Sequence, residues 1–191
     1  LECAPATVYF SQDAAMKGDG HPGMGGYMHG YAWSFMLEAR HLCIPIAALE
    51  FIAWVCSIIL FEPLLRRLPG EPHGARVIVS ESDALSPTLV IQNDRAGSPI
   101  MQYIHALADD LPQLASLRSE LLLQHCWGPG NIMSDPLSRG QLLIFTQLCR
   151  QMDIRPHFLE FNQEALAFLD KCATEQAEIL RSTPPHNKTT A

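Results

Sequence analysis

The sequence predicts an α/β fold in which a mixed sheet is flanked by helices. Short runs of β-branched and aromatic residues, bounded by Gly, Pro, Asn and Asp, are typical of strands. Longer segments with apolar residues at helical spacing indicate helices between these runs and after them. The predicted order is three strands, a helix, a strand, helices, a strand and a helix, followed by a helical extension.

A chain of 191 residues is long enough for one domain with appendages, or for two small domains. With 48% hydrophobic and 17% charged residues, it can bury a core. The six cysteines are scattered without a C-x-x-C pair, which indicates reduced thiols of an intracellular protein rather than a disulfide framework or a zinc site. Because the chain begins at Leu1, we expect it to be a fragment of a longer polypeptide.

Five segments are predicted to form the sheet, and the first three are expected to be antiparallel. The first strand is followed by a Gly-dense stretch, residues 13–26, which is predicted to be a loop. The next two strands form a hairpin around His29-Gly30, with Trp33 facing the core. The predicted strands are Thr7–Ser11, Tyr27–Met28, Tyr31–Phe35, Ala75–Ser82 and Leu121–Trp127.

The most apolar segment, Ile44–Phe61, is predicted to be a helix and is long enough for a membrane span to be considered. Glu50 lies inside it, and a central carboxylate costs about 2.5–3.5 kcal/mol on insertion scales. Pro45 starts the segment and Glu62-Pro63 ends it early. We therefore expect a buried helix between the sheet and other helices, and no membrane partner.

The remaining helices are predicted from apolar spacing, and Pro112 should break one of them. They are Ala84–Asn93, Ser98–Leu117, Gln141–Met152 and Asn162–Ala177. These elements divide the chain into a domain of residues 1–140, a helical extension of residues 141–180 and a polar tail of residues 181–191, which is predicted to be disordered.

The stretch Gln124–Gly140 joins the end of a buried strand to the start of a helix through a Gly-Pro-Gly-Asn turn. Ser134 is predicted to be the N-cap of this helix, and Pro136 suits its first turn. Asp135 is then held at a helix N-terminus, just beyond a strand end. It is either part of a cap or a metal ligand, and the stretch alone leaves both open.

This stretch resembles a known block. Its pattern H-x-x-G-x-x-N-x-x-x-D-x-L-S-R, from His125 to Arg139, is similar to the last block of the RNase H domain attached to reverse transcriptases of gypsy-like and tyrosine-recombinase retroelements. The order of elements over roughly Thr7–Arg139 also resembles the RNase H fold, which implies a mixed five-stranded sheet flanked by helices. In that family the aspartate of the block is the final metal-binding carboxylate, which implies this role for Asp135.

The other blocks of the family have counterparts here, in the same order. Asp13 stands where the first block has its aspartate, although Ala14-Ala15 replaces the usual Gly-Ser or Ala-Ser. Glu50 lies in an apolar-x-x-L-E-apolar-x-A pattern that resembles the second block. Asp83 follows Ser82 at a predicted strand end, as in the third block. The resemblance thus implies four site carboxylates, Asp13, Glu50, Asp83 and Asp135.

Each of these residues also has an alternative interpretation. Glu50 could form an ion pair at the helix end with Arg40 or Arg66. Asp83 could be the N-cap of the helix that follows it, and Glu81, on the same face of the strand by alternation, competes with it as the functional acid.

Four carboxylates within a few ångströms of one another repel and persist only if divalent cations lie between them. Oxygen ligands suit Mg²⁺ or Mn²⁺, and two such ions can clamp a scissile phosphate. The resemblance implies cleavage of the RNA strand of RNA–DNA hybrids. It also implies a helper role for His125, which moves protons or aids product release and is not a metal ligand.

The net charge of −7 argues against a free-standing nucleic-acid binder. An upstream reverse-transcriptase domain would then supply much of the affinity for the hybrid. Three features leave open a catalytically inactive connection or interaction module: the low pI, the Ala14-Ala15 departure, and Trp127, which replaces the usual Pro of the turn. An integrase or transposase is a third possibility, although these usually show three acids and a different final block.

Overall fold

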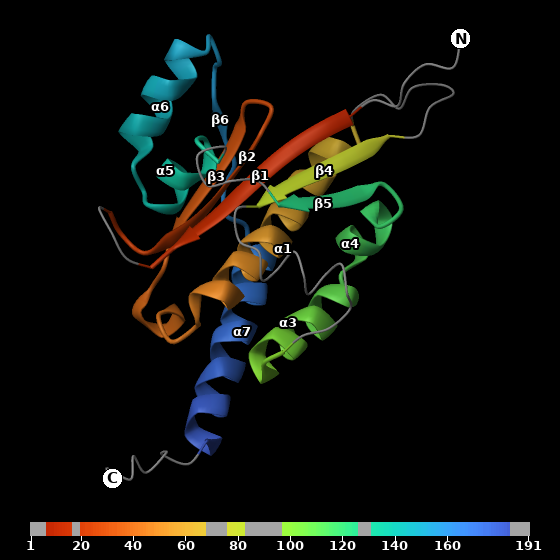
Figure 1. The fold of residues 1–191 in the computed structure, drawn as a ribbon, viewed down its shortest axis with the longest axis vertical. Helices are drawn as coiled ribbons and strands as arrows, with labels where there is room; N and C mark the ends of the chain where they lie inside the picture. Colours follow the sequence, from red (N-terminus) through yellow and green to blue (C-terminus); the bar gives the residue numbers. More distant parts are fainter. Residues whose placement is uncertain (1–6, 17–19, 68–75, 83–96, 126–130, 184–191) are drawn as a thin grey trace.

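The computed structural model describes residues 7–16, 20–67, 76–82, 97–125 and 131–183. Its centre is a six-stranded mixed sheet in the order β5-β4-β1-β2-β3-β6, with helices on both faces (Figure 1). The strands are β1 (Thr7–Ala15), β2 (Gly23–Met28), β3 (Tyr31–Met36), β4 (Val77–Ser82), β5 (Leu121–His125) and β6 (His157–Phe158).

The predicted α/β architecture is confirmed. Strands β1, β2 and β3 are antiparallel, as expected, and β4 and β5 run parallel to β1. The sheet also has a sixth strand, β6, which pairs with Tyr31 and Ala32 at the sheet edge. It was not predicted, because a strand of two residues has no recognisable sequence pattern. Residues 126–127, which end the predicted fifth strand, lie outside the described residues.

The Gly-dense stretch is largely strand and not loop. Strand β1 continues to Ala15 and β2 begins at Gly23, with Asp13 opposite Gly25 in the ladder. Glycine is depleted in strands because it offers no side chain to pack. A stretch with many glycines is therefore predicted to be a loop. Here the missing side chains serve the packing of a helix on this part of the sheet, as described below.

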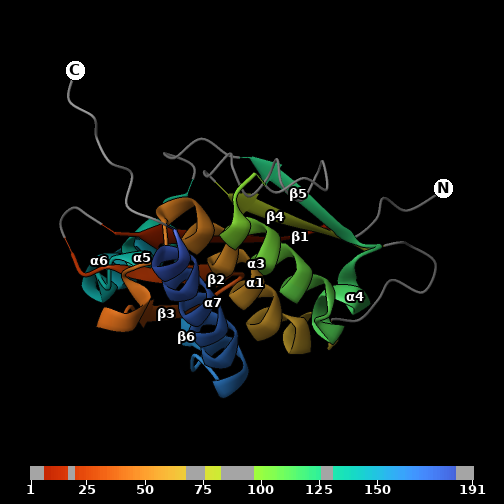
Figure 2. The same cartoon turned by 90° about the horizontal axis from the view of Figure 1, so that it is seen from below.

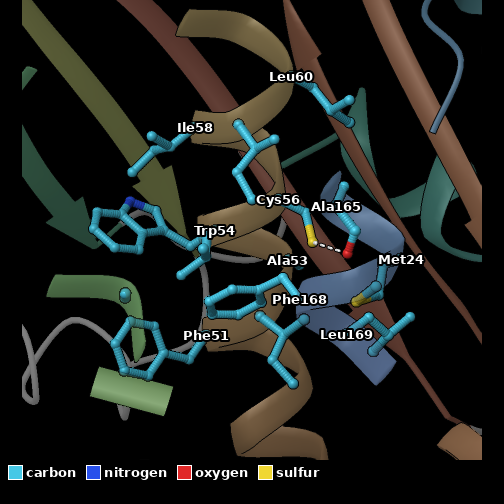
Figure 3. Close-up of a cluster of buried hydrophobic side chains, with 14 of the residues drawn as sticks. Met24, Phe51, Ala53, Trp54, Cys56, Ile58, Leu60, Ala165, Phe168 and Leu169 are labelled. Carbon is cyan, nitrogen blue, oxygen red and sulfur yellow. Dashed lines mark hydrogen bonds between the residues drawn. The ribbon is translucent and has the colours of Figure 1, made fainter. Parts of the chain in front are cut away.

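Helix α1 (Ile46–Leu65) covers one face of the sheet. Every residue from Ala48 to Glu62 is buried, which explains why its sequence is apolar nearly all round. Figure 3 shows Phe51 and Trp54 projecting from one side of α1, whereas Cys56 lies toward Met24, Phe168 and Leu169. Helix α1 is long and apolar enough to cross a membrane, but 89% of its most apolar window is buried inside the protein, as in a core helix.

Three further helices lie on the same face, where α1, α3 and α7 contact one another (Figure 2). They are α3 (Pro99–Asp109), α4 (Pro112–Leu117) and α7 (Gln163–Ser182). Pro112 separates α3 from α4, as predicted. Asn162 caps α7 by accepting a hydrogen bond from the Ala165 backbone, and α7 continues to Ser182, beyond the predicted end. The predicted helix Ala84–Asn93 lies outside the described residues.

The opposite face carries two short helices, α5 (Ser134–Ser138) and α6 (Leu142–Gln151). A small second core joins them to the sheet, formed by Ala32, Met133, Leu137, Phe145 and Cys149. Alternation along the strands separates the two faces. Ala14 belongs to the α1 core, and the adjacent Asp13 therefore faces α5.

The described cysteines that are free are Cys43, Cys56, Cys149 and Cys172, in agreement with the prediction of reduced thiols. The Cys56 thiol donates to the Ala165 carbonyl (3.9 Å; Figure 3). Burial raises the pKa of the Cys172 thiol to about 12 and that of Cys56 well above its usual range. Both therefore stay protonated and unreactive at neutral pH.

Candidate active site

Helix α5 lies unusually close to the sheet because glycine occupies the facing positions of β2. A Cβ atom added at Gly25 would lie 2.5 Å from the Cβ of Leu137 and 2.7 Å from the backbone nitrogen of Ser138. One added at Gly23 would lie 2.6 Å from the Ser138 carbonyl oxygen. Any side chain at these two positions would push α5 away from β1 and β2.

Three hydrogen bonds of serine hydroxyl groups attach α5 to the sheet. The hydroxyl groups of Ser11 and Ser134 are hydrogen-bonded at 2.6 Å, and Ser34 on β3 donates to the Leu137 carbonyl at 2.6 Å. Ser138 donates to the Asp13 carboxylate. These three contacts fix the register of α5 against β1 and β3.

Asp13 is the buried acid of this face. It lies on β1, between β4 and β2, and is only 6% exposed. A carboxylate is costly to bury unless hydrogen bonds, an opposite charge or a metal ion compensates it. The Ser138 hydroxyl supplies one such hydrogen bond. Asp13 is thus held in a fixed position by the helix that carries Asp135.

Asp135 is the second residue of α5, and its side chain is 49% exposed. Arg139, one turn later, donates from Nε to its carboxylate at 2.9 Å. The prediction that Ser134 caps this helix is wrong. The helix starts one residue earlier than expected, so Met133 holds the N-cap position and Ser134 bonds to Ser11 instead. No side-chain cap bond of α5 is found among the described residues, so a capping role for Asp135 is not supported.

Glu50 is buried on α1, a helix that contacts the Asp13 strand β1, and 8% of its surface is exposed. The two candidate arginines form ion pairs with other acids. Arg40 pairs with Glu38 and Asp170, and Arg66 pairs with Glu62. These contacts remove the support for an ion pair between Glu50 and either arginine, and the metal-ligand role of Glu50 stays a prediction.

Asp83 lies outside the described residues, directly after the end of β4 at Ser82. Its competitor Glu81 is described. Glu81 is opposite Ser11 in the β1–β4 ladder and therefore lies on the face of Asp13. There it lines a hollow of about 200 Å³ together with Ser11 and Tyr27. The choice between Asp83 and Glu81 as the third acid stays open.

His125 is the last residue of β5, the edge strand next to β4. It is opposite Ser82 in the β4–β5 ladder, so it lies beside the strand end that leads to Asp83. The structure thus places His125 beside the C-terminal end of β4. Its predicted helper role is not tested by this position alone.

Sequence reasoning missed a buried polar cluster beneath the site. Gln12 accepts from Ser80 on β4 (3.2 Å) through its side chain and from Asn131 (3.0 Å) through its backbone carbonyl. These residues and Ser138 are all buried. Asn131 and Ser138 both belong to the block from His125 to Arg139 that contains Asp135. Their place in this pattern was the only sequence feature that could have indicated their roles.

Within the described part of the chain, no group of three or more His, Cys, Asp or Glu side chains is placed to hold a metal ion. What the structure does bring together is Asp13 and the helix of Asp135, through Ser138. The predicted four-carboxylate set, with Asp83 outside the described residues, and the two Mg²⁺ or Mn²⁺ ions stay predictions.

A search of family models and a search of curated proteins each found no match for this chain. Among solved structures, the crystal structure of LC11-RNase H1 in complex with an RNA/DNA hybrid is similar, with a TM-score of 0.53 and 13% sequence identity. The similarity covers 71% of this chain and 99% of that one. At this identity the comparison concerns the fold, and it shows that the chain has an RNase H-like fold.

Proposed function

We propose that this chain is a metal-dependent nuclease domain that cleaves the RNA strand of RNA–DNA hybrids. The observation that carries the proposal is the pairing of Asp13 with the Asp135 helix. A buried carboxylate on the central strand is held by a serine of the short helix that carries a second carboxylate. The RNase H-like fold and the block from His125 to Arg139 support the same function.

The acids of this chain fit hard divalent cations. Asp13, Glu50, Asp83 and Asp135 would hold two Mg²⁺ or Mn²⁺ ions, because carboxylate oxygens are the ligands that suit these metals. When bound, the two ions would stabilise charge on the scissile phosphate. Asp135, which is half exposed, would face the substrate side, and His125 would move protons beside the end of β4.

We further propose that the chain acts within a reverse-transcriptase polyprotein inside the cell. The net charge of −7 makes the isolated chain a poor nucleic-acid binder. An upstream reverse-transcriptase domain would supply most of the affinity for the hybrid, whose 2′-hydroxyl groups distinguish it from duplex DNA. The helical extension proposed for residues 141–180 would be part of the same unit, since α7 packs on α1.

A catalytically inactive interaction module is the second candidate, and one contact favours it. The ion pair between Arg139 and Asp135 engages a carboxylate that the nuclease would need for metal. The pair is partly exposed on both sides, with 29% and 49% of the two side chains accessible. Such pairs contribute only about 0–1 kcal/mol, so a divalent cation can displace the arginine. The contact therefore leaves the nuclease as the better proposal.

The variant Asp135→Asn tests the proposal, with Asp110→Asn at an exposed position as the matched control. Without metal, Asp135→Asn should change the free energy of unfolding by less than about 1 kcal/mol, since an exposed pair is lost while charge repulsion is relieved. Excess Mg²⁺ should stabilise the parent more than the variant, by ligand linkage. Cleavage of a labelled hybrid should fall about a hundredfold or more. Unchanged cleavage, or unfolding of the metal-free variant, would refute the assignment.

The variant His125→Ala tests the helper role. Cleavage should slow by up to about a hundredfold, because a group that moves protons is lost, while the stabilisation by Mg²⁺ stays that of the parent. His157→Ala, at the other edge of the sheet, is the control and should cleave normally. If His125→Ala also loses the Mg²⁺ effect, His125 is a ligand and the helper role is wrong.

A further inference from the structure

Ser138 is the serine of the D-x-L-S-R block, and the block by itself assigns it no role. It is fully buried, with 0% exposure, and lies at the last position of α5. Its hydroxyl donates to one oxygen of the Asp13 carboxylate and lies 2.8 Å from the backbone carbonyl of Asp135. One hydroxyl group therefore touches the side chain of one site acid and the backbone of the other.

We propose that Ser138 is a positioning residue, whose hydroxyl fixes the rotamer of the Asp13 carboxylate relative to α5. The inference rests on the proposed function, because it concerns the orientation of an acid in that site. A carboxylate on a strand can rotate about its side-chain bonds, and a donor in a fixed place selects one orientation. The donor here is fixed because its helix is packed directly on glycine positions of β2.

Two other serine contacts attach α5 to the sheet independently of Ser138. Ser134 bonds to Ser11, and Ser34 bonds to the Leu137 carbonyl, and neither contact involves a carboxylate. Among these three contacts, only that of Ser138 reaches a site acid. Removing the Ser138 hydroxyl should therefore leave these two attachments of α5 in place and remove the hydrogen bond from α5 to the Asp13 carboxylate.

The consequence is a loss of metal affinity without a loss of fold. Hydrogen-bond partners that orient a metal ligand typically contribute about 10–100-fold to metal affinity or activity. We expect Ser138→Ala to need about 10–100-fold more Mg²⁺ for half-maximal stabilisation. Its turnover number should fall, while the KM for the hybrid stays near that of the parent.

Ser134→Ala is the matched control, because Ser134 is also a fully buried serine of α5 bonded to β1. The experiment measures thermal unfolding of the full chain against Mg²⁺ concentration, without substrate, and then hybrid cleavage. Both variants should unfold at similar temperatures without metal, and only Ser138→Ala should shift the Mg²⁺ dependence. Ser138→Cys keeps the size and a weak S–H donor, so its Mg²⁺ dependence should lie between parent and Ser138→Ala.

Three outcomes overturn the inference. If Ser134→Ala shifts the Mg²⁺ dependence as much as Ser138→Ala, the serines act only by attaching the helix. If the parent cleaves the hybrid and neither Ser138 variant changes the Mg²⁺ dependence, Ser138 does not position Asp13, and the proposed function still stands. If the parent is neither stabilised by Mg²⁺ nor active, the proposed function fails, and the role of Ser138 fails with it.

Discussion

Replacing Asp13 by Asn is expected to abolish hybrid cleavage while leaving the fold intact. The amide keeps the shape of the side chain, and its oxygen can still accept the hydrogen bond from Ser138. The variant removes the buried negative charge, so the metal-free protein should be as stable as the parent or more stable. Cleavage should fall by at least about a hundredfold, since a proposed metal ligand is lost.

The measurement compares chemical unfolding without metal and single-turnover cleavage at saturating Mg²⁺. Asp153→Asn, an exposed acid in the turn after α6, serves as the control and should behave as the parent. A variant that unfolds without metal would make Asp13 a structural acid. A variant that cleaves at the parent rate would place the chemistry elsewhere in the chain.

Adding a single methyl group at Gly25 is expected to have the second-largest effect. In Gly25→Ala the new Cβ would lie 2.5 Å from the Leu137 Cβ and 2.7 Å from backbone atoms of α5. These are contacts with a helix, not with the end of a flexible side chain, so α5 must move. Overpacking of this kind costs about 1–3 kcal/mol, and the shift carries Asp135 and Ser138 away from Asp13. Cleavage per folded molecule should fall at least about tenfold, because small misplacements of site groups have large effects.

Gly97→Ala is the matched control, because a Cβ at Gly97 meets no atom within 4 Å. It should change neither stability nor cleavage. Urea unfolding gives the folded fraction, and cleavage is measured well below the unfolding midpoint. If Gly25→Ala is destabilised yet cleaves at the parent rate, the position of α5 does not matter for the reaction.

The described helices on the α1 face of the sheet and the β2–β3 hairpin could be predicted because their signals are local. Residues 48–62 of α1 are apolar nearly all round and are buried, although the helix continues through Glu62-Pro63 to Leu65, beyond the predicted end. The start of β2 was not predicted, because glycine locally favours loops. Glycine is needed at position 25 because α5, more than one hundred residues later in the chain, packs directly on it. Strand β6 was missed because two residues carry no periodicity. Both failures concern long-range packing that overrides local preference.

The acids of the site could be proposed from their positions at strand ends and from the family pattern. The contacts that surround these acids could not be predicted from the sequence. The sequence does not show that Ser138 faces Asp13, because this depends on which side of a five-residue helix meets the sheet. For the same reason the sequence predicts a cap at Ser134, whereas in the structure the Ser134 hydroxyl is hydrogen-bonded to Ser11.

Cleavage of an RNA–DNA hybrid by the 191-residue chain tests the proposed nuclease activity directly. The protein is used in excess over the labelled hybrid, which compensates for weak binding, with Mg²⁺, with Mn²⁺ and with a chelator. We predict that only the RNA strand is cut, that cutting leaves 5′-phosphate ends, and that the chelator stops it. Duplex DNA should remain intact. Absence of cleavage with both metals, or cleavage that survives the chelator, would contradict a metal-dependent nuclease built around Asp13 and Asp135.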